Sequence, residues 1–102
     1  MAAATKVLVV GAGGRMGLAI ARLIAQRAVP GLELAGAVDR AGAALVGQDA
    51  GVAAGVGPLG VVIGDDLSAA LAARPDVAVD FSSPAAAAAT ATQVPAARVP
   101  WA

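Results

Sequence analysis

The sequence KVLVVGAGGRMG at residues 6–17 joins a short apolar run to a glycine-rich turn. The run is rich in β-branched residues and ends at Gly11, which is typical of a strand buried on both faces of a parallel sheet. Glycine recurs at positions 11, 14 and 17. This spacing would allow positive φ in the turn, close approach of the backbone to a pyrophosphate, and tight packing of the next helix on the strand.

A helix and a second strand are predicted after the turn. Residues 15–28 have apolar side chains at helical spacing, which predicts an amphipathic helix with one face on the sheet. The apolar face would consist of Met16, Ala19, Ile20, Leu23 and Ile24, and the polar face of Arg15, Arg22 and Gln26. Pro30 and Gly31 end the helix, and residues 32–38 predict a strand that finishes at Asp39 and Arg40. Strand, helix and strand form one βαβ unit.

The rest of the chain continues the alternation of strands and helices. Residues 41–60 predict a long loop with a turn of helix, which is usually a functional or mobile element. A short strand at 61–63, a helix from Asp65 and Asp66 to residue 73, and a strand at 76–81 follow. Ser83 and Pro84 have the pattern of a further helix start. The predicted fold class is α/β, a Rossmann-like parallel sheet with flanking helices.

Composition excludes several classes of function. Seven basic and seven acidic residues balance, so no basic face is expected for nucleic acid. The longest uncharged stretch, between Asp80 and Arg98, contains prolines and polar residues, which argues against a membrane span. The N-terminal apolar run is too short for a signal peptide, so a cytoplasmic location is expected. Without histidine or cysteine, no metal site is predicted.

The glycine-rich turn is the candidate binding site for a dinucleotide. Asp39 ends the second predicted strand 22 residues after Gly17, where an acidic side chain would accept hydrogen bonds from the adenosine ribose. Arg40 would pair with a 2′-phosphate, so either NADH or NADPH is expected as cofactor. The candidate turn residues are Gly11, Ala12, Gly13, Gly14, Arg15, Met16 and Gly17. The structural alternative is a glycine-rich turn followed by two solvated charges.

Four segments of the chain resemble one enzyme family. The Gly-Arg-Met-Gly run at residues 14–17 is similar to the signature of dihydrodipicolinate reductases. The acidic-Arg pair in residues 37–40, the loop at 45–51 and the Asp-Phe-Ser-Ser-Pro run ending at Pro84 agree with that family in order and spacing. The resemblance covers roughly residues 5–84.

The resemblance implies roles for particular residues. Backbone amides of Arg15 and Met16 would bind the pyrophosphate, Asp39 and Arg40 the adenosine end. Phe81 and Ser82 would lie at the nicotinamide. For this last pair the alternative remains open: Phe81 would only fill the core, and Ser82 would only cap the following helix.

The resemblance also implies an activity for the complete enzyme. A hydride would pass from the nicotinamide to a cyclic, unsaturated dicarboxylate and give tetrahydrodipicolinate, a step of lysine and diaminopimelate biosynthesis. The complete enzyme is expected to be a homo-oligomer, with paired histidines and a lysine in a second, catalytic domain. This chain has no histidine, and Lys6 is its only lysine.

Residues 1–102 are therefore expected to be one dinucleotide-binding domain, incomplete at the C-terminus, without catalytic residues and without the substrate domain. An unpaired edge at the strand 76–81 would then favour aggregation. Two alternatives stay open, namely a stand-alone nucleotide-binding module without catalysis and another NAD(P)-dependent dehydrogenase.

Overall fold

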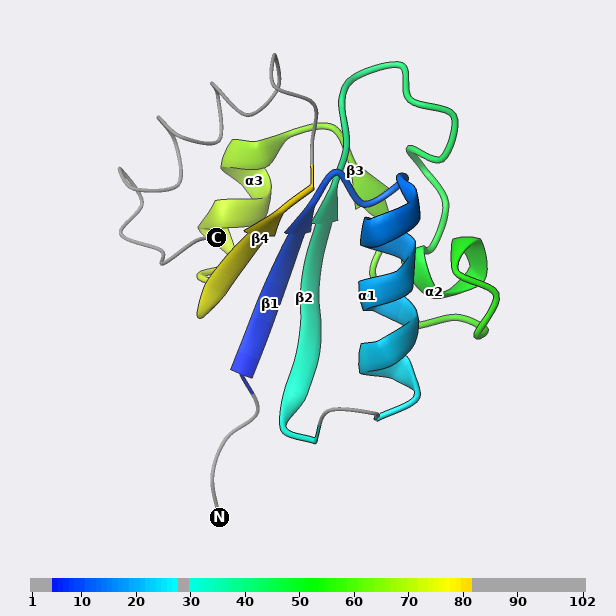
Figure 1. The fold of residues 1–102 in the computed structure, drawn as a ribbon. Coiled ribbons are helices and arrows are strands. Elements are labelled where there is room, and N and C mark those ends of the chain that lie inside the picture. Colours follow the sequence, from blue (N-terminus) through cyan, green and yellow to red (C-terminus); the bar gives the residue numbers. More distant parts are fainter. Residues whose placement is uncertain (1–4, 28–29, 82–102) are drawn as a thin grey trace.

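The fold is a parallel sheet with helices on both faces (Figure 1). The structure is a computed structural model that describes residues 5–27 and 30–81. The strands are β1 (Thr5–Val10), β2 (Leu32–Val38), β3 (Ile63–Gly64) and β4 (Val77–Asp80). Their order in the sheet is β3-β2-β1-β4, and all three pairings are parallel. This order matches the first four strands of the 3-2-1-4-5-6 order of a doubly wound Rossmann sheet, and it confirms the predicted fold class.

Three helices cover the sheet in the described part of the chain: α1 (Arg15–Ala25), α2 (Ala50–Ala53) and α3 (Leu67–Ala72). In Figure 1, α1 and α2 lie on one side of the sheet and α3 lies on the other. None of the helices in residues 5–27 and 30–81 has the length and apolar character that a membrane crossing requires.

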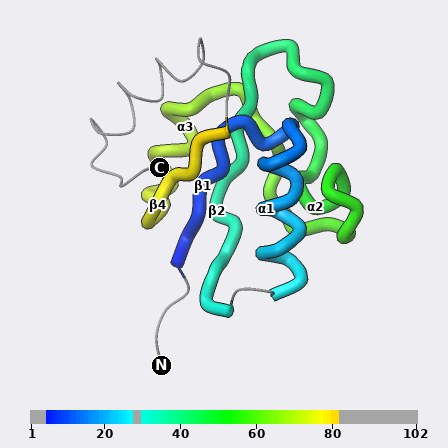
Figure 2. The backbone as a smooth tube through the Cα atoms, viewed as in Figure 1, coloured from blue at the N-terminus to red at the C-terminus, as the bar shows by residue number. Residues whose placement is uncertain are grey.

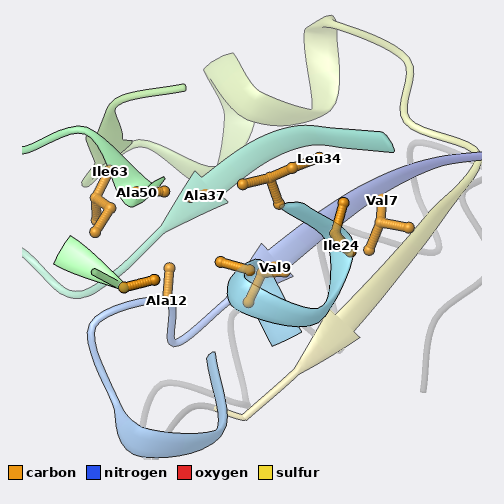
Figure 3. Packing of buried hydrophobic residues seen from close by; sticks show 10 residues of the cluster. Val7, Val9, Ala12, Ile24, Leu34, Ala37, Ala50 and Ile63 are labelled. Atoms are coloured by element: carbon orange, nitrogen blue, oxygen red, sulfur yellow. The ribbon is translucent and has the colours of Figure 1, made fainter. Parts of the chain in front are cut away.

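The two faces of β1 enter two separate apolar clusters. Val7 and Val9 pack with Ile24 of α1, whereas Leu8 and Val10 pack with Leu71 of α3. Figure 3 shows the first cluster, in which side chains of β1, β2 and β3 point toward α1. Leu8 is 0% exposed, so the prediction of a strand buried on both faces is confirmed.

Element boundaries agree with the sequence to within a few residues. The strand predicted at 32–38 is found with the same bounds. The first helix ends at Ala25, earlier than predicted, because Arg27 takes a left-handed conformation with φ 55°. The third strand is Ile63–Gly64, two residues later than predicted at its start. The predicted helix at Ser83 and Pro84 lies outside the described residues.

The predicted apolar face of α1 is partly wrong. Met16 is 56% exposed and Leu23 is 42% exposed, while Gly17, Ala21 and Ile24 are the buried residues of the helix. The small residues bring α1 close to the sheet. A Cβ on Gly17 would lie only 2.4 Å from the carbonyl oxygen of Gly11. This close approach sets the rotation of the helix, which hydrophobic periodicity cannot resolve.

The long loop at 41–60 is fixed to the sheet edge. Its segment at residues 47–50 runs antiparallel to 61–63, with hydrogen bonds of 2.8 Å from Gly47 N to the Ile63 carbonyl and from Ile63 N to the Gln48 carbonyl. Arg22 of α1 donates from Nε to the carbonyl oxygen of Ala54 at 3.1 Å. The loop does contain the expected turn of helix, α2.

Asp49 organises this loop through its carboxylate. It caps α2 by accepting hydrogen bonds from the backbone N–H groups of Gly51 and Val52, and it also accepts from Leu59 and Gly60. The hydrogen bond from Leu59, together with those from Val52, Gly60 and Gly51, lowers the pKa of Asp49 below its usual value of 3.8, although burial acts in the opposite direction. One ionised side chain therefore joins both ends of the α2 segment.

Candidate functional site

The glycine-rich turn lies at the carboxyl end of β1 and is held by the end of β2. The N–H groups of Gly11 and Ala12 both donate to the carbonyl oxygen of Val38, at 2.8 and 3.0 Å. Gly11 has φ 82°, a conformation that glycine adopts without strain. Gly14 instead has φ −81° and extended backbone, so only the first of the three predicted glycines uses positive φ.

The third glycine serves helix packing, as its spacing predicted. Gly17 is buried, and a Cβ on it would lie 2.4 Å from the Gly11 oxygen and 2.7 Å from the Cα of Ala12. These are backbone atoms of the turn itself, which cannot move aside as a flexible side chain would. Any larger residue here would push α1 away from the turn.

The start of α1 presents free backbone donors. The first N–H groups of a helix have no acceptor within the helix, and the N-cap Gly14 has no side chain to supply one. Arg15 and Met16, which follow it, are both exposed. Such an uncapped helix start attracts an anion through its N–H groups and its dipole. A phosphate group is an anion of the kind that such a helix start binds.

Asp39 lies directly against this turn. Its Oδ2 accepts a hydrogen bond of 2.8 Å from the backbone N–H of Gly13, and its Oδ1 accepts one of 2.8 Å from the backbone N–H of Arg40. The Asp39 N–H donates to the carbonyl oxygen of Gly64 at 2.9 Å, which ties the residue to β3. Asp39 is half-buried and Arg40 is exposed. The acidic residue and the glycine-rich turn are therefore neighbours in space.

The loop after β2 closes one side of the turn. Leu45 lies in this loop, and its Cβ is 3.6 Å from the position that a Cβ on Gly13 would occupy. Figure 2 shows the segment between β2 and α2 passing beside the start of α1. Sequence reasoning did not assign Leu45 to the site. No periodic signal marks this residue, because it lies in an irregular loop.

Phe81 is the last described residue and lies next to the turn-proximal end of β1. Its N–H donates to the carbonyl oxygen of Val10 at 2.8 Å. The side chain is half-buried and packs against the cluster on the α1 face. This contact is compatible with either of the two roles considered for Phe81, so the role at the nicotinamide stays a prediction. Ser82 lies outside the described residues.

The described residues offer binding groups but no metal cluster. Across residues 5–27 and 30–81, no three acidic side chains are grouped so that they could hold a metal ion, and the chain contains no histidine or cysteine. What the site can do chemically is bind an anion at the helix start and accept hydrogen bonds at Asp39.

The parallel sheet, the glycine-rich turn and the carboxylate after β2 together define a Rossmann-type domain. A structure of an amine dehydrogenase from Mycobacterium smegmatis shares the fold, with a TM-score of 0.59 and 32% sequence identity. The match covers 74% of this chain and 21% of that one. The family model described as "Dihydrodipicolinate reductase, N-terminus" matches residues 5–101. The chain therefore belongs to the dihydrodipicolinate reductase family, which confirms the resemblance found in the sequence.

Curated relatives agree with the family. A protein of Anaeromyxobacter dehalogenans named 4-hydroxy-tetrahydrodipicolinate reductase is 57% identical over 79 residues, which is 78% of this chain and 28% of that protein. A protein of the same name from Alkalilimnicola ehrlichii is 50% identical over 82 residues, or 80% of this chain and 30% of that protein. The chain thus spans less than a third of the length of these relatives.

Proposed function

We propose that this chain binds NADH or NADPH and forms the cofactor-binding part of a 4-hydroxy-tetrahydrodipicolinate reductase. The observation that carries the proposal is the 2.8 Å hydrogen bond between the Gly13 N–H and the Asp39 carboxylate. It brings a ribose acceptor against an uncapped helix start, the two features that dinucleotide recognition requires at this point of the fold.

Each part of the site would bind one part of the cofactor. The backbone N–H groups from Gly11 to Gly17, chiefly those of Arg15 and Met16, would hold the pyrophosphate. The Asp39 carboxylate would accept hydrogen bonds from the adenosine ribose, and the exposed Arg40 guanidinium would pair with a 2′-phosphate when NADPH is bound. Phe81 and Ser82 would lie on the nicotinamide side.

A reduced nicotinamide bound in this way would supply a hydride to a cyclic, unsaturated dicarboxylate, giving tetrahydrodipicolinate for lysine and diaminopimelate biosynthesis. The contribution of this chain to that reaction is to position the cofactor. Its described residues hold no histidine or lysine beside the turn that would transfer a proton. We therefore propose that the groups that bind the dicarboxylate and deliver the proton belong to a further part of the enzyme.

The names of the relatives favour this reductase over another dehydrogenase. Identity reaches 57% with a protein named 4-hydroxy-tetrahydrodipicolinate reductase, against 32% with the chain of the amine dehydrogenase structure. The cytoplasm remains the proposed location, and a homo-oligomer the proposed state of the complete enzyme.

Calorimetric titration of the chain with NADH and with NADPH tests the proposal. We expect saturable binding of both, weakened at least tenfold in Asp39→Ala because a charged acceptor is lost. Glu33→Ala is the matched control, since Glu33 is an exposed carboxylate at the opposite end of β2. The proposal is wrong if a folded sample binds neither dinucleotide, or if both variants lose the same affinity.

A further inference from the structure

The loop at 41–60 is tied to α1 as well as to the sheet. Ala50, the first residue of α2, and Ala54, its C-cap, are buried in the apolar cluster that also contains Ile24 of α1. Arg22 of α1 donates from Nε to the Ala54 carbonyl oxygen at 3.1 Å. The loop therefore packs against the same helix whose start is the proposed phosphate site.

A single carboxylate closes this loop. Asp49 is half-buried, and its Oδ1 accepts hydrogen bonds from the N–H groups of Gly51 at 2.8 Å and Leu59 at 3.0 Å. Its Oδ2 accepts a hydrogen bond of 2.8 Å from the N–H of Gly60. Loss of the carboxylate would leave the N–H groups of Leu59 and Gly60 without this acceptor, so the chain would lose what joins the two ends of the α2 segment.

The first part of the same loop reaches the glycine-rich turn. Leu45 is half-buried, and its Cβ lies 3.6 Å from the position that a Cβ on Gly13 would occupy. Two residues after Leu45, the Gly47 N–H donates to the Ile63 carbonyl oxygen of β3 at 2.8 Å. The loop thus runs without interruption from the side of the turn, along β3, to the segment that Asp49 closes.

From these contacts we propose that closure of the loop at 41–60 is coupled to dinucleotide binding, and that Asp49 is a positioning residue that holds the loop closed. In the closed loop, Leu45 lines the turn and α2 supports α1, whereas opening loses both contacts. A dinucleotide that binds the closed form more tightly must favour closure by the same factor. The inference rests on the proposed function, because the dinucleotide is the ligand of that same turn.

Amide hydrogen exchange with and without NADH tests this coupling in the unmodified chain. If only the closed form binds, NADH at about 100 times its dissociation constant slows exchange through loop opening by at most about 100-fold. At that concentration we expect the Leu59 amide, which Asp49 binds, to exchange at least about tenfold more slowly than without NADH.

The Ala69 amide is the matched control for Leu59. It also donates to an aspartate carboxylate, that of Asp66 at 3.2 Å, but it lies in α3 on the other side of the sheet (Figure 1). Opening at the start of α3 does not open the loop, so NADH should slow exchange of this amide by less than about twofold.

Each outcome of the exchange experiment decides the coupling. Equal slowing of the two amides would mean that NADH stabilises the fold as a whole, and it overturns the inference, as does an unchanged Leu59 amide. Titration of the same sample separates the two proposals. NADH that binds without selective protection of Leu59 overturns the inference alone, whereas a folded sample that binds neither dinucleotide overturns the proposed function with it.

Asp49→Ala compared with Asp66→Ala gives a second measurement. Each variant removes an aspartate that caps a helix, α2 or α3, but only Asp49 lies in the loop. We expect Asp49→Ala to weaken NADH and NADPH by the same factor of about five, and Asp66→Ala to weaken either by less than about twofold. Equal losses in the two variants refute the coupling. Circular dichroism establishes that both are folded, and the exchange experiment decides alone if Asp49→Ala is not.

Discussion

The Asp49 carboxylate accepts a 3.0 Å hydrogen bond from the backbone N–H of Leu59, ten residues further along the chain. The same Oδ1 also binds the N–H groups of Gly51 and Val52, so a single side chain closes the segment that contains α2. Because the loop at 41–60 contacts the glycine-rich turn through Leu45, the order of this loop bears on the proposed cofactor site.

Asp49→Ala should loosen this loop. It leaves the N–H groups of Leu59 and Gly60 without their acceptor, so we expect a lower Tm and faster protease cleavage within residues 41–60. Asp65→Ala is a suitable control, as Asp65 is an exposed carboxylate beside β3. Equal cleavage rates in the two variants would contradict this role for Asp49.

The lowered pKa of Asp49 makes part of the stability depend on pH. Hydrogen bonds from Leu59 and the other backbone donors place the pKa in the folded state below the usual value of 3.8. The ionised form therefore stabilises the fold above that value, and the contribution is lost as pH falls through the folded pKa. Urea unfolding from pH 7 to pH 2 should show a difference between wild type and Asp49→Asn that shrinks below pH 3.8. If the difference in stability stays constant across this pH range, the ionised Asp49 carboxylate is not the cause of the pH dependence.

Gly17→Ala should be among the more damaging single-methyl changes in the chain. The new Cβ would lie 2.4 Å from the Gly11 oxygen, so α1 or the turn must shift. We expect this shift to lower the free energy of unfolding by about 3 kcal/mol. Gly64→Ala provides the comparison, because nothing lies within 4 Å of its Cβ position. Gly64→Ala should change the free energy of unfolding by less than about 0.5 kcal/mol. Chemical denaturation of both variants measures the difference between their stability losses. Equal losses would show that Gly17 does not approach the Gly11 backbone closely.

The orientation of α1 predicts that alanine substitutions at two adjacent helix residues differ strongly in their effect on stability. Ile24 is 7% exposed within the core, so Ile24→Ala should destabilise the fold by about 2–4 kcal/mol. Leu23 is 42% exposed, and Leu23→Ala should change the stability by less than about 1 kcal/mol. Denaturant midpoints measure both stability losses. Equal losses would support the apolar face of α1 predicted from periodicity, which contains both residues.

The elements around α1 and the glycine-rich turn show which features the sequence predicts and which it does not. Local sequence patterns predicted the strand at 32–38, the glycine-rich turn that begins at Gly11, and the acidic residue Asp39 at the end of that strand. Each of these features has its own signal in composition or spacing. The rotation of α1 depends on the contact between Gly17 and the Gly11 oxygen, a distance that no periodicity encodes. The hydrogen bond from Gly13 to Asp39 likewise joins residues 26 apart, so only the folded sheet brings them together.

The proposed pairing of Arg40 with a 2′-phosphate predicts that its side chain affects NADPH binding more than NADH binding. Its guanidinium is exposed, and its backbone N–H already binds Asp39 Oδ1. Arg40→Ala keeps that N–H and removes the side chain beyond Cβ, including the charged guanidinium. We expect NADPH affinity to fall about threefold to tenfold, since a charge-assisted pair with the 2′-phosphate is lost, and NADH affinity to change less than twofold.

Ionic strength adds an independent check on Arg40. Salt screens an exposed guanidinium, so the effect of Arg40→Ala on NADPH should shrink between low and high salt concentration. Arg27→Ala serves as the control, because Arg27 is an exposed arginine beyond the far end of α1. Titration of both variants with each dinucleotide decides the matter. If Arg40→Ala weakens NADH as much as NADPH, its side chain acts on the shared part of the cofactor, and the assignment to the 2′-phosphate is wrong.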